Sequence, residues 1–270
     1  MGISVAKASL IGLLLVGIPR ASTGQPIEPD VNGLEFKCMA NASKVGSKLV
    51  VSRMKCTSKC VSLIWKGLLA DDPASCFVQP FSNAFMDACV ANADSKFLLG
   101  FRKRCDASLS PGADCPECYG GGDCVADSTV RDTQVASLID GFGPSVFCER
   151  TGAFLLEMRC ELTTAKVIPK YVAKLNRCYD KCFALVRKGI VAPASCGPPA
   201  TDPLVQDCLA LARADAIKAI GHDCHPPPGS PDACGDPYPD GAAWADQVEA
   251  AFVPDVPVTY CGSPSGAFLD

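Results

Sequence analysis

Two distant stretches of the chain spell the same short motif, and this repetition constrains the fold more than any other feature. Residues 53–67 read RMKCTSKCVSLIWKG and residues 175–189 read LNRCYDKCFALVRKG. Sliding the chain against itself by 122 positions superposes these stretches, and small gaps extend the agreement to a whole set of cysteines. Cys38, Cys56, Cys60, Cys76, Cys89, Cys105, Cys115 and Cys148 fall on Cys160, Cys178, Cys182, Cys196, Cys208, Cys224, Cys234 and Cys261. The sequence therefore predicts a repeated unit of domain size.

The N-terminus predicts export. Residues 1–7 carry one positive charge, residues 8–18 are apolar, and residues 21–24 are small, which together are typical of a secretory signal peptide. The apolar run is too short to span a bilayer, and we expect no transmembrane segment in the mature chain. We expect a signal peptide over 1–24, unit one over 25–148, unit two over 149–261 and a tail over 262–270. The localisation predicted is periplasmic or extracellular.

The 18 cysteines agree with export, because an even count behind a signal peptide favours a disulfide framework. Cys38, Cys56 and Cys60 share one face of an ideal helix, which predicts a long amphipathic helix with a cysteine seam. A second helix is expected over 80–105. In an antiparallel hairpin the numbers of facing residues have a nearly constant sum. This register predicts the bridges Cys38–Cys105, Cys56–Cys89, Cys60–Cys76, Cys160–Cys224, Cys178–Cys208 and Cys182–Cys196.

The fold class predicted is all-α, with two tandem disulfide-stapled helical-hairpin units that each carry a third short helix. The third helices are expected around residues 130–139 and 244–252. Bridges Cys115–Cys148 and Cys234–Cys261 would tie them to the hairpins, and Cys118 and Cys124, which lack counterparts, would pair with each other. Pro169 is expected to break or kink the first helix of unit two.

Basic residues follow the cysteine seam in both units. On an ideal helix the six in unit one project within about 60° of one another, and the same six positions of unit two are also basic. These two basic stripes are Lys37, Lys44, Lys48, Lys55, Lys59 and Lys66 in unit one, and Arg159, Lys166, Lys170, Arg177, Lys181 and Lys188 in unit two.

Two interpretations of the stripes are open. They are either solvated flanks whose charges pair loosely with acids such as Asp87, Asp94, Asp207 and Asp215, or a docking ridge for a polyanion, an anionic membrane surface or an acidic partner. Removing residues 1–24 moves the formal net charge from −4 to −6, because Lys7 and Arg20 are lost. An acidic chain of this kind argues against nucleic acid as the partner.

The segment CPECYGGGDC, residues 115–124, could carry out thiol-redox or metal chemistry. Its C-P-x-C spacing occurs in thiol oxidoreductases, but no strand-helix-strand pattern surrounds it. Cys115, Cys118, Cys124 and Cys148 could alternatively hold a structural zinc ion. The loop 120–123 could also be presented as an inhibitor-like decoy.

Other catalytic motifs are missing from the sequence. The chain has two histidines, His222 and His225, and a histidine-metal interpretation with Asp223 lacks a further ligand nearby. The simpler interpretation is that both histidines are polar residues at a helix C-terminus, where positive charge is favourable. There is no G-x-S-x-G, P-loop or dinucleotide fingerprint. We expect no cofactor and no metal.

The C-x3-C, the K-G, the PASC and the CPECY segments resemble those of cysteine-rich helical repeat proteins exported by bacteria. This resemblance implies an exported helical repeat protein and no activity. The function predicted is an exported, non-enzymatic binding or structural module with a basic stripe on each unit. The alternative is a thiol-redox or metal-binding protein that uses the CPEC segment.

Overall fold

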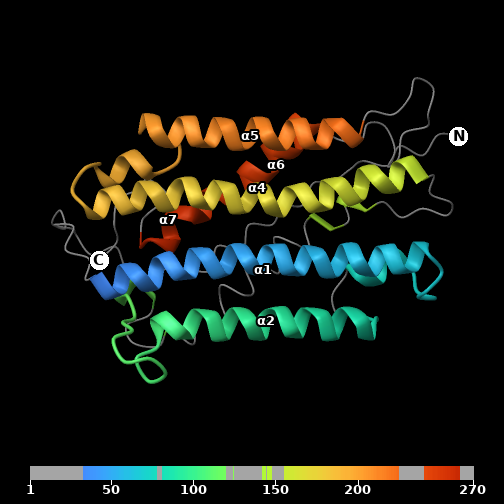
Figure 1. Ribbon diagram of the computed structural model, residues 1–270, viewed down its shortest axis with the longest axis horizontal. Helices are drawn as coiled ribbons and strands as arrows, with labels where there is room; N and C mark the ends of the chain where they lie inside the picture. Colours follow the sequence, from blue (N-terminus) through green and yellow to red (C-terminus); the bar gives the residue numbers. More distant parts are fainter. Residues whose placement is uncertain are drawn as a thin grey trace, which may run out of the picture.

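The computed structural model describes residues 33–77, 81–119, 124, 142–143, 145–147, 155–224 and 240–261. Within these ranges the protein is all-α, as expected, with helices and no strands. Figure 1 shows α2, α1, α4 and α5 side by side in this order, with α6 and α7 crossing the row. The long helices are α1 (Gly33–Trp65), α2 (Ala84–Cys105), α4 (Leu155–Arg187) and α5 (Pro203–Asp223), and the shorter ones are α6 (Gly241–Phe252) and α7 (Val256–Thr259).

Helices α1 and α4 end in the same way, at the K-G of the repeated motif. Gly67 and Gly189 have φ values of 67° and 68°, in the left-handed region that favours glycine. The N–H of Leu68 donates to the Leu63 carbonyl at 2.9 Å. Gly67 donates to Ile64 at 2.8 Å, which completes a Schellman motif. The second glycine therefore stops α4 as the first stops α1.

Each hairpin turn contains a short 3₁₀ helix and an N-cap. The PASC segments form η1 (Pro73–Cys76) and η3 (Pro193–Cys196). Asn83 then caps α2, since its side-chain oxygen accepts from the N–H groups of Phe85 and Met86. Asp202 caps α5 through the N–H groups at the start of that helix.

Three disulfides staple each hairpin, and all six are the ones predicted from the register. The Cα–Cα distances of corresponding bridges are 4.8 and 4.7 Å, 5.8 and 5.7 Å, and 5.8 and 5.7 Å. The bridges are Cys38–Cys105, Cys56–Cys89 and Cys60–Cys76 in the first hairpin, and Cys160–Cys224, Cys178–Cys208 and Cys182–Cys196 in the second. Because equivalent cysteines pair in the two copies, both hairpins have the same helix register.

Pro169 does not break its helix, contrary to one of the two outcomes expected. Helix α4 runs as one element from Leu155 to Arg187 with the proline inside it. Pro169 is buried, and the bridges at Cys160 and Cys178 on either side keep the spacing of their counterparts. Because these bridges hold both halves of α4 against α5, tertiary contacts offset the lost backbone hydrogen bond.

The two hairpins pack against each other through α1 and α4, which run antiparallel. Figure 1 shows the N-terminal end of α1 beside the C-terminal end of α4. In agreement, the Arg187 guanidinium lies over the Phe36 ring at 5.1 Å, and Ser43 donates to Asp180 at 2.6 Å. Both buried clusters of the protein contain residues of both hairpins. Neither hairpin therefore has a hydrophobic core of its own.

Helix α6 covers the groove between α4 and α5 and confirms the third helical segment expected around residues 244–252. Trp244 and Val248 are buried against α4 and α5 residues such as Val172 and Ala216. The Tyr171 hydroxyl of α4 donates to Glu249 of α6, and Arg213 of α5 donates to the same carboxylate at 2.9 Å. The corresponding segment at 130–139 lies outside the described residues.

The CPECY segment departs from the predicted bridges. Cys115 pairs with Cys124, and Cys118 pairs with Cys261, 143 residues away. The predicted Cys118–Cys124, Cys115–Cys148 and Cys234–Cys261 pairs are therefore wrong, while Cys148 and Cys234 themselves lie outside the described residues.

The reason for these pairings is packing between the two hairpins. The segment contains η2 (Glu117–Tyr119), and the Tyr119 ring stacks on Phe101 of α2 at 6.1 Å between centroids. Its hydroxyl donates to the Thr259 carbonyl, which brings Cys118 to the C-terminal segment. The expectation that every bridge stays within one unit failed because the units share their cores.

The division into two tandem units at 148/149 stays a prediction, as does the signal peptide, which lies outside the described residues.

The abundant disulfides indicate a protein that matures in an oxidising environment. None of the helices in the described part of the chain has the length and apolar character needed to cross a membrane.

Candidate functional site

The twelve basic residues singled out in the sequence are all exposed. Ten lie within α1 and α4, and Lys66 and Lys188 lie in the turns directly after these helices. Helix α1 holds one acidic residue, Glu35, in its first turn. The strong local excess of positive charge thus lies on the two central helices, although the chain as a whole has a formal net charge of −4.

Polar contacts between α1 and α4 fix the register of the two stripes. Ser43 donates to Asp180 at 2.6 Å, and Asn176 donates to Ser47 at 2.5 Å. In both pairs the residue numbers have the same sum, as antiparallel helices require. Tyr260 also donates to Asp180 at 2.5 Å, which ties the C-terminal segment to this interface.

This register places both stripes on one side of the helix pair. Ser43 and Ser47 mark the direction from α1 to α4, and Asn176 and Asp180 mark the reverse direction. Viewed from the N-terminus of either helix, its stripe lies about 100° clockwise from that contact direction, at ~100° per residue. Because the helices are antiparallel, equal rotations in the same sense lead to the same side. We call the twelve residues together the basic face.

The opposite side of α4 is covered. Ile168, Tyr179 and Val186 are buried and lie roughly opposite the stripe on this helix. Burial, together with the charge of Glu249 on α6, raises the pKa of Tyr179 to about 12. Helix α6 therefore packs on the side that carries no stripe, so that the basic face stays open.

Ion pairing leaves most of the basic face uncompensated. Among the described residues, Arg159 is the one member with an ion pair, at 2.8 Å from Asp223. Lys59 lies over the Phe85 ring at 5.4 Å from its centroid. Apart from Arg159 with Asp223 of α5, the stripe side chains thus do not form the loose pairing with α2 and α5 acids that the solvated-flank interpretation assumed.

Two of those acids are instead bound by cations outside the stripes. Asp94 lies 2.8 Å from Arg53, whose side chain is 6% exposed, and Asp215 lies 2.6 Å from Lys174. Sequence reasoning missed the Arg53 pair, because Arg53 lies on the buried side of α1 and no pattern marks it. For Asp87 and Asp207 the described residues include no ion-pair partner.

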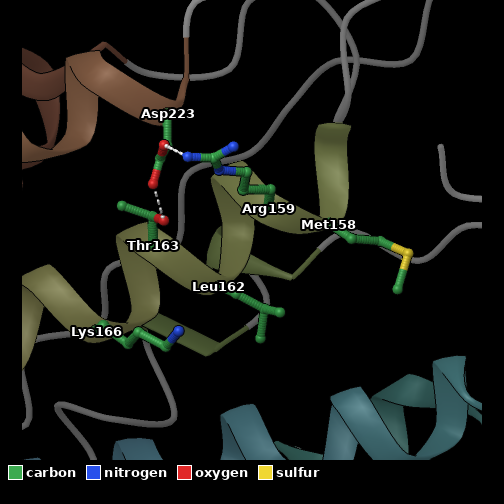
Figure 2. Close-up of a pocket in the computed structure, with 6 residues that line it drawn as sticks. All are labelled: Met158, Arg159, Leu162, Thr163, Lys166 and Asp223. Atoms are coloured by element: carbon green, nitrogen blue, oxygen red, sulfur yellow. Dashed lines mark hydrogen bonds and ion pairs between the residues drawn. The ribbon is translucent and has the colours of Figure 1, made fainter. Parts of the chain in front are cut away.

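An open surface depression lies at the N-terminal end of α4 (Figure 2). Arg159 and Thr163 both point toward Asp223, and Thr163 donates to it at 2.6 Å. These contacts hold the pKa of the Asp223 carboxyl at about 2, with the Thr163 hydrogen bond as the largest cause. His222 is exposed and lies 3.0 Å from the same carboxylate, while His225 lies outside the described residues. Arg159 thus neutralises Asp223, and the described side chains of the depression form no catalytic arrangement.

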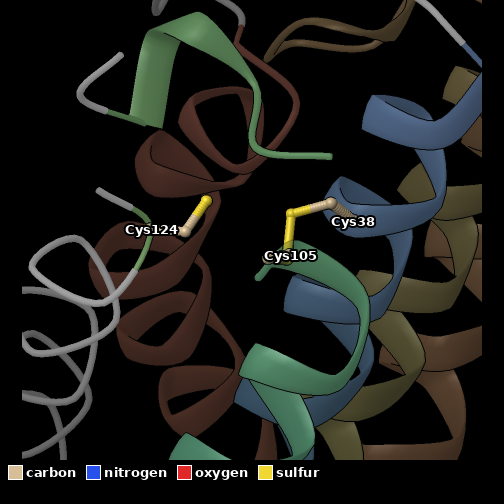
Figure 3. A group of neighbouring side chains, drawn as sticks. All are labelled: Cys38, Cys105 and Cys124. Carbon is tan, nitrogen blue, oxygen red and sulfur yellow. A yellow bond between two sulfur atoms is a disulfide. The ribbon is translucent and has the colours of Figure 1, made fainter. Parts of the chain in front are cut away.

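Of the four cysteines considered for zinc or redox chemistry, Cys115, Cys118 and Cys124 are in disulfides, and Cys148 lies outside the described residues. Figure 3 shows Cys38 bonded to Cys105, with Cys124 close by. The three sulfur atoms lie within 4.8 Å of one another, yet Cys124 is itself paired with Cys115. A sulfur atom in a disulfide is not the thiolate that zinc or redox chemistry needs. Within the described part of the chain there is no free cysteine.

Comparisons with protein-family models, with curated proteins and with solved structures gave no match to this chain.

Proposed function

We propose that the protein is an exported, non-enzymatic docking module whose basic face binds an anionic surface or an acidic partner. One observation carries this proposal: two basic stripes that are 122 residues apart in the sequence lie exposed on the same side of α1 and α4, and of their twelve members Arg159 is the one with an ion pair to another described residue. Aligned, uncompensated charges raise the local concentration of a ligand of opposite sign.

The dimensions of the face fit an extended ligand. From Lys37 to Lys66 the stripe covers 29 residue steps, or about 43 Å of helix. The neighbouring helix axis lies about 8–10 Å away, so that both rows of cations can contact one surface together. A small anion would use only a fraction of the twelve residues.

Export is supported by the disulfides and by the expected signal peptide. Bridges of this number are typical of proteins that mature outside the reducing cytosol. The redox or metal alternative is not favoured by any contact of the CPEC segment, since Cys115 and Cys118 are each paired with a cysteine outside that tetrapeptide.

The proposal is tested by retention on a sulfonated cation-exchange resin at neutral pH and low salt. We expect the mature protein to bind despite its negative net charge and to elute as salt screens the face. The double variant Lys48→Glu/Lys170→Glu should lose retention, because each lysine near an anionic surface contributes about 1 kcal/mol.

The matched control is Lys103→Glu/Lys218→Glu, which changes the net charge equally at exposed positions of α2 and α5. This control should elute close to the unmodified protein. Equal loss of retention in both double variants would mean that net charge, rather than the basic face, governs binding and would contradict the proposal. Flow-through of the unmodified protein would contradict it as well.

A further inference from the structure

Each end of the basic face carries a large aliphatic side chain exposed to solvent. Leu68 is 68% exposed and Ile190 is 66% exposed, and each follows the glycine that ends its helix. The two positions are 122 residues apart, so that both units have an aliphatic residue at the same place. Each of these side chains leaves apolar surface in contact with water, which a partner at this end of the face can cover.

Hydrogen bonds place the backbone of these two residues at the edge of the basic face. The N–H of Leu68 donates to the Leu63 carbonyl, and the N–H of Ile190 donates to the Leu185 carbonyl at 3.0 Å. Leu63 follows Lys59 by four residues and precedes Lys66 by three, so that it neighbours both on the helix surface. Leu185 likewise follows Lys181 by four residues and precedes Lys188 by three, so that it neighbours the last two lysines of the α4 stripe.

The two aliphatic residues lie at opposite ends of the face. Figure 1 shows that α1 and α4 end at opposite ends of the molecule. Leu68 and Ile190 are therefore separated by roughly the length of a stripe, about 40 Å. Between them the face is two helices wide and positively charged.

We propose that the basic face docks flat on an anionic phospholipid bilayer, with Leu68 and Ile190 inserting at its two ends. This inference rests on the proposed function and names the anionic surface. Peripheral proteins bind such bilayers through lysines that contact the headgroups together with aliphatic side chains that reach the acyl boundary. A linear polyanion would use the lysines and would leave the two aliphatic residues without a role.

The two ends are not equivalent. The turn after Leu68 continues with the exposed acids Asp71 and Asp72, whereas Ile190 is followed by Val191 and Ala192. Carboxylates next to an anionic surface oppose docking. Ile190 should therefore contribute more to membrane binding than Leu68.

The test is co-sedimentation with phosphatidylcholine vesicles with and without phosphatidylglycerol. We expect binding only with phosphatidylglycerol, and a decrease of about tenfold in vesicle affinity for Leu68→Ser/Ile190→Ser. Of the single variants, Ile190→Ser should show the larger decrease. The control Leu99→Ser/Leu211→Ser alters two leucines that are each 66% exposed on α2 and α5, and it should bind like the unmodified protein.

The outcomes separate the inference from the proposed function. Phosphatidylglycerol binding that Leu68→Ser/Ile190→Ser leaves unchanged would overturn insertion. Retention on the cation exchanger, or binding to dextran sulfate, without binding to anionic vesicles would overturn the bilayer as ligand and leave the proposed function standing. Failure to bind the resin as well as the vesicles would overturn both.

Discussion

Asp180 is the residue on which the contact between the two hairpins depends most visibly. Its carboxylate accepts hydrogen bonds from Ser43 of α1 and from Tyr260 of the C-terminal segment. Burial raises the pKa of Asp180, and the two hydrogen bonds and the charge of Arg177 lower it without cancelling the effect. A carboxyl with a raised native pKa binds its proton more tightly in the folded state than in the unfolded state.

This shift gives a pH prediction. The stability that Asp180 contributes is greatest below its ordinary pKa of 3.8 and is lost as the pH rises through its higher native pKa. Asp180→Asn removes the titration while keeping an acceptor for Ser43 and Tyr260. We therefore expect the variant to gain stability relative to the unmodified protein between about pH 4 and pH 7.

Urea denaturation of both proteins at several pH values, with the disulfides intact, measures this difference. A difference in the free energy of unfolding that does not change with pH would show that Asp180 titrates normally. This residue could not be identified from the sequence, because the aligned position in unit one is Ser58 and a single acid between two cysteines marks no site.

At the scale of helices and turns, the sequence predicts the contacts that are local or that recur at the same spacing in both units. The cysteine seam, the hairpin register and the exposed stripes follow from helix periodicity, and the six hairpin bridges are confirmed. Pro169 was harder to judge, since tertiary packing on α5 overrides a local propensity. The unbroken helix matters here, because it keeps the α4 stripe on one continuous element.

The glycines that end α1 and α4 lead to a second prediction, on the stability of glycine-to-alanine variants. An alanine at position 189 would meet no neighbouring atom within 4 Å, but it would have to adopt a φ of 68°. Gly189→Ala should therefore destabilise the protein by about 1 kcal/mol. Gly46→Ala, inside α1, also meets no neighbour and should instead stabilise it by about 0.5–1 kcal/mol.

Thermal or chemical unfolding of the two variants checks the signs. The same chemical change thus has opposite effects at a helix end and inside a helix. If Gly189→Ala were neutral, the Schellman motif after α4 would contribute little, and the placement of Ile190 at the end of the basic face would lose its support.

At the scale of the whole molecule, the arrangement of the hairpins could not be read from the sequence. Repeats suggest separate units, yet both buried clusters here combine residues of the two hairpins, and Cys118–Cys261 joins them covalently. Spacing rules work within a hairpin, where facing residues are set by register. They carry no information on which surfaces of two hairpins meet.

The Cys118–Cys261 bridge leads to a third testable prediction. Cys118→Ser/Cys261→Ser opens a link across 143 residues and should destabilise the protein by about 2–4 kcal/mol, because the unfolded chain gains entropy. Cys115→Ser/Cys124→Ser opens a link across 9 residues and should cost less. Denaturant titrations of the two double variants under oxidising conditions give the comparison, and equal costs would argue against a stabilising role for the longer link.

The proposed function requires that the two basic stripes lie on one side of the antiparallel helices α1 and α4. Mass-spectrometric mapping of lysine cross-links, made with a short amine-reactive reagent on the monomeric protein, would check this geometry. The α1–α4 register predicts links from Lys44 to Lys181 and from Lys59 to Lys166, across helix axes about 8–10 Å apart. Links that instead join Lys44 to Lys166 and Lys59 to Lys181, or no links between the two stripes, would contradict it.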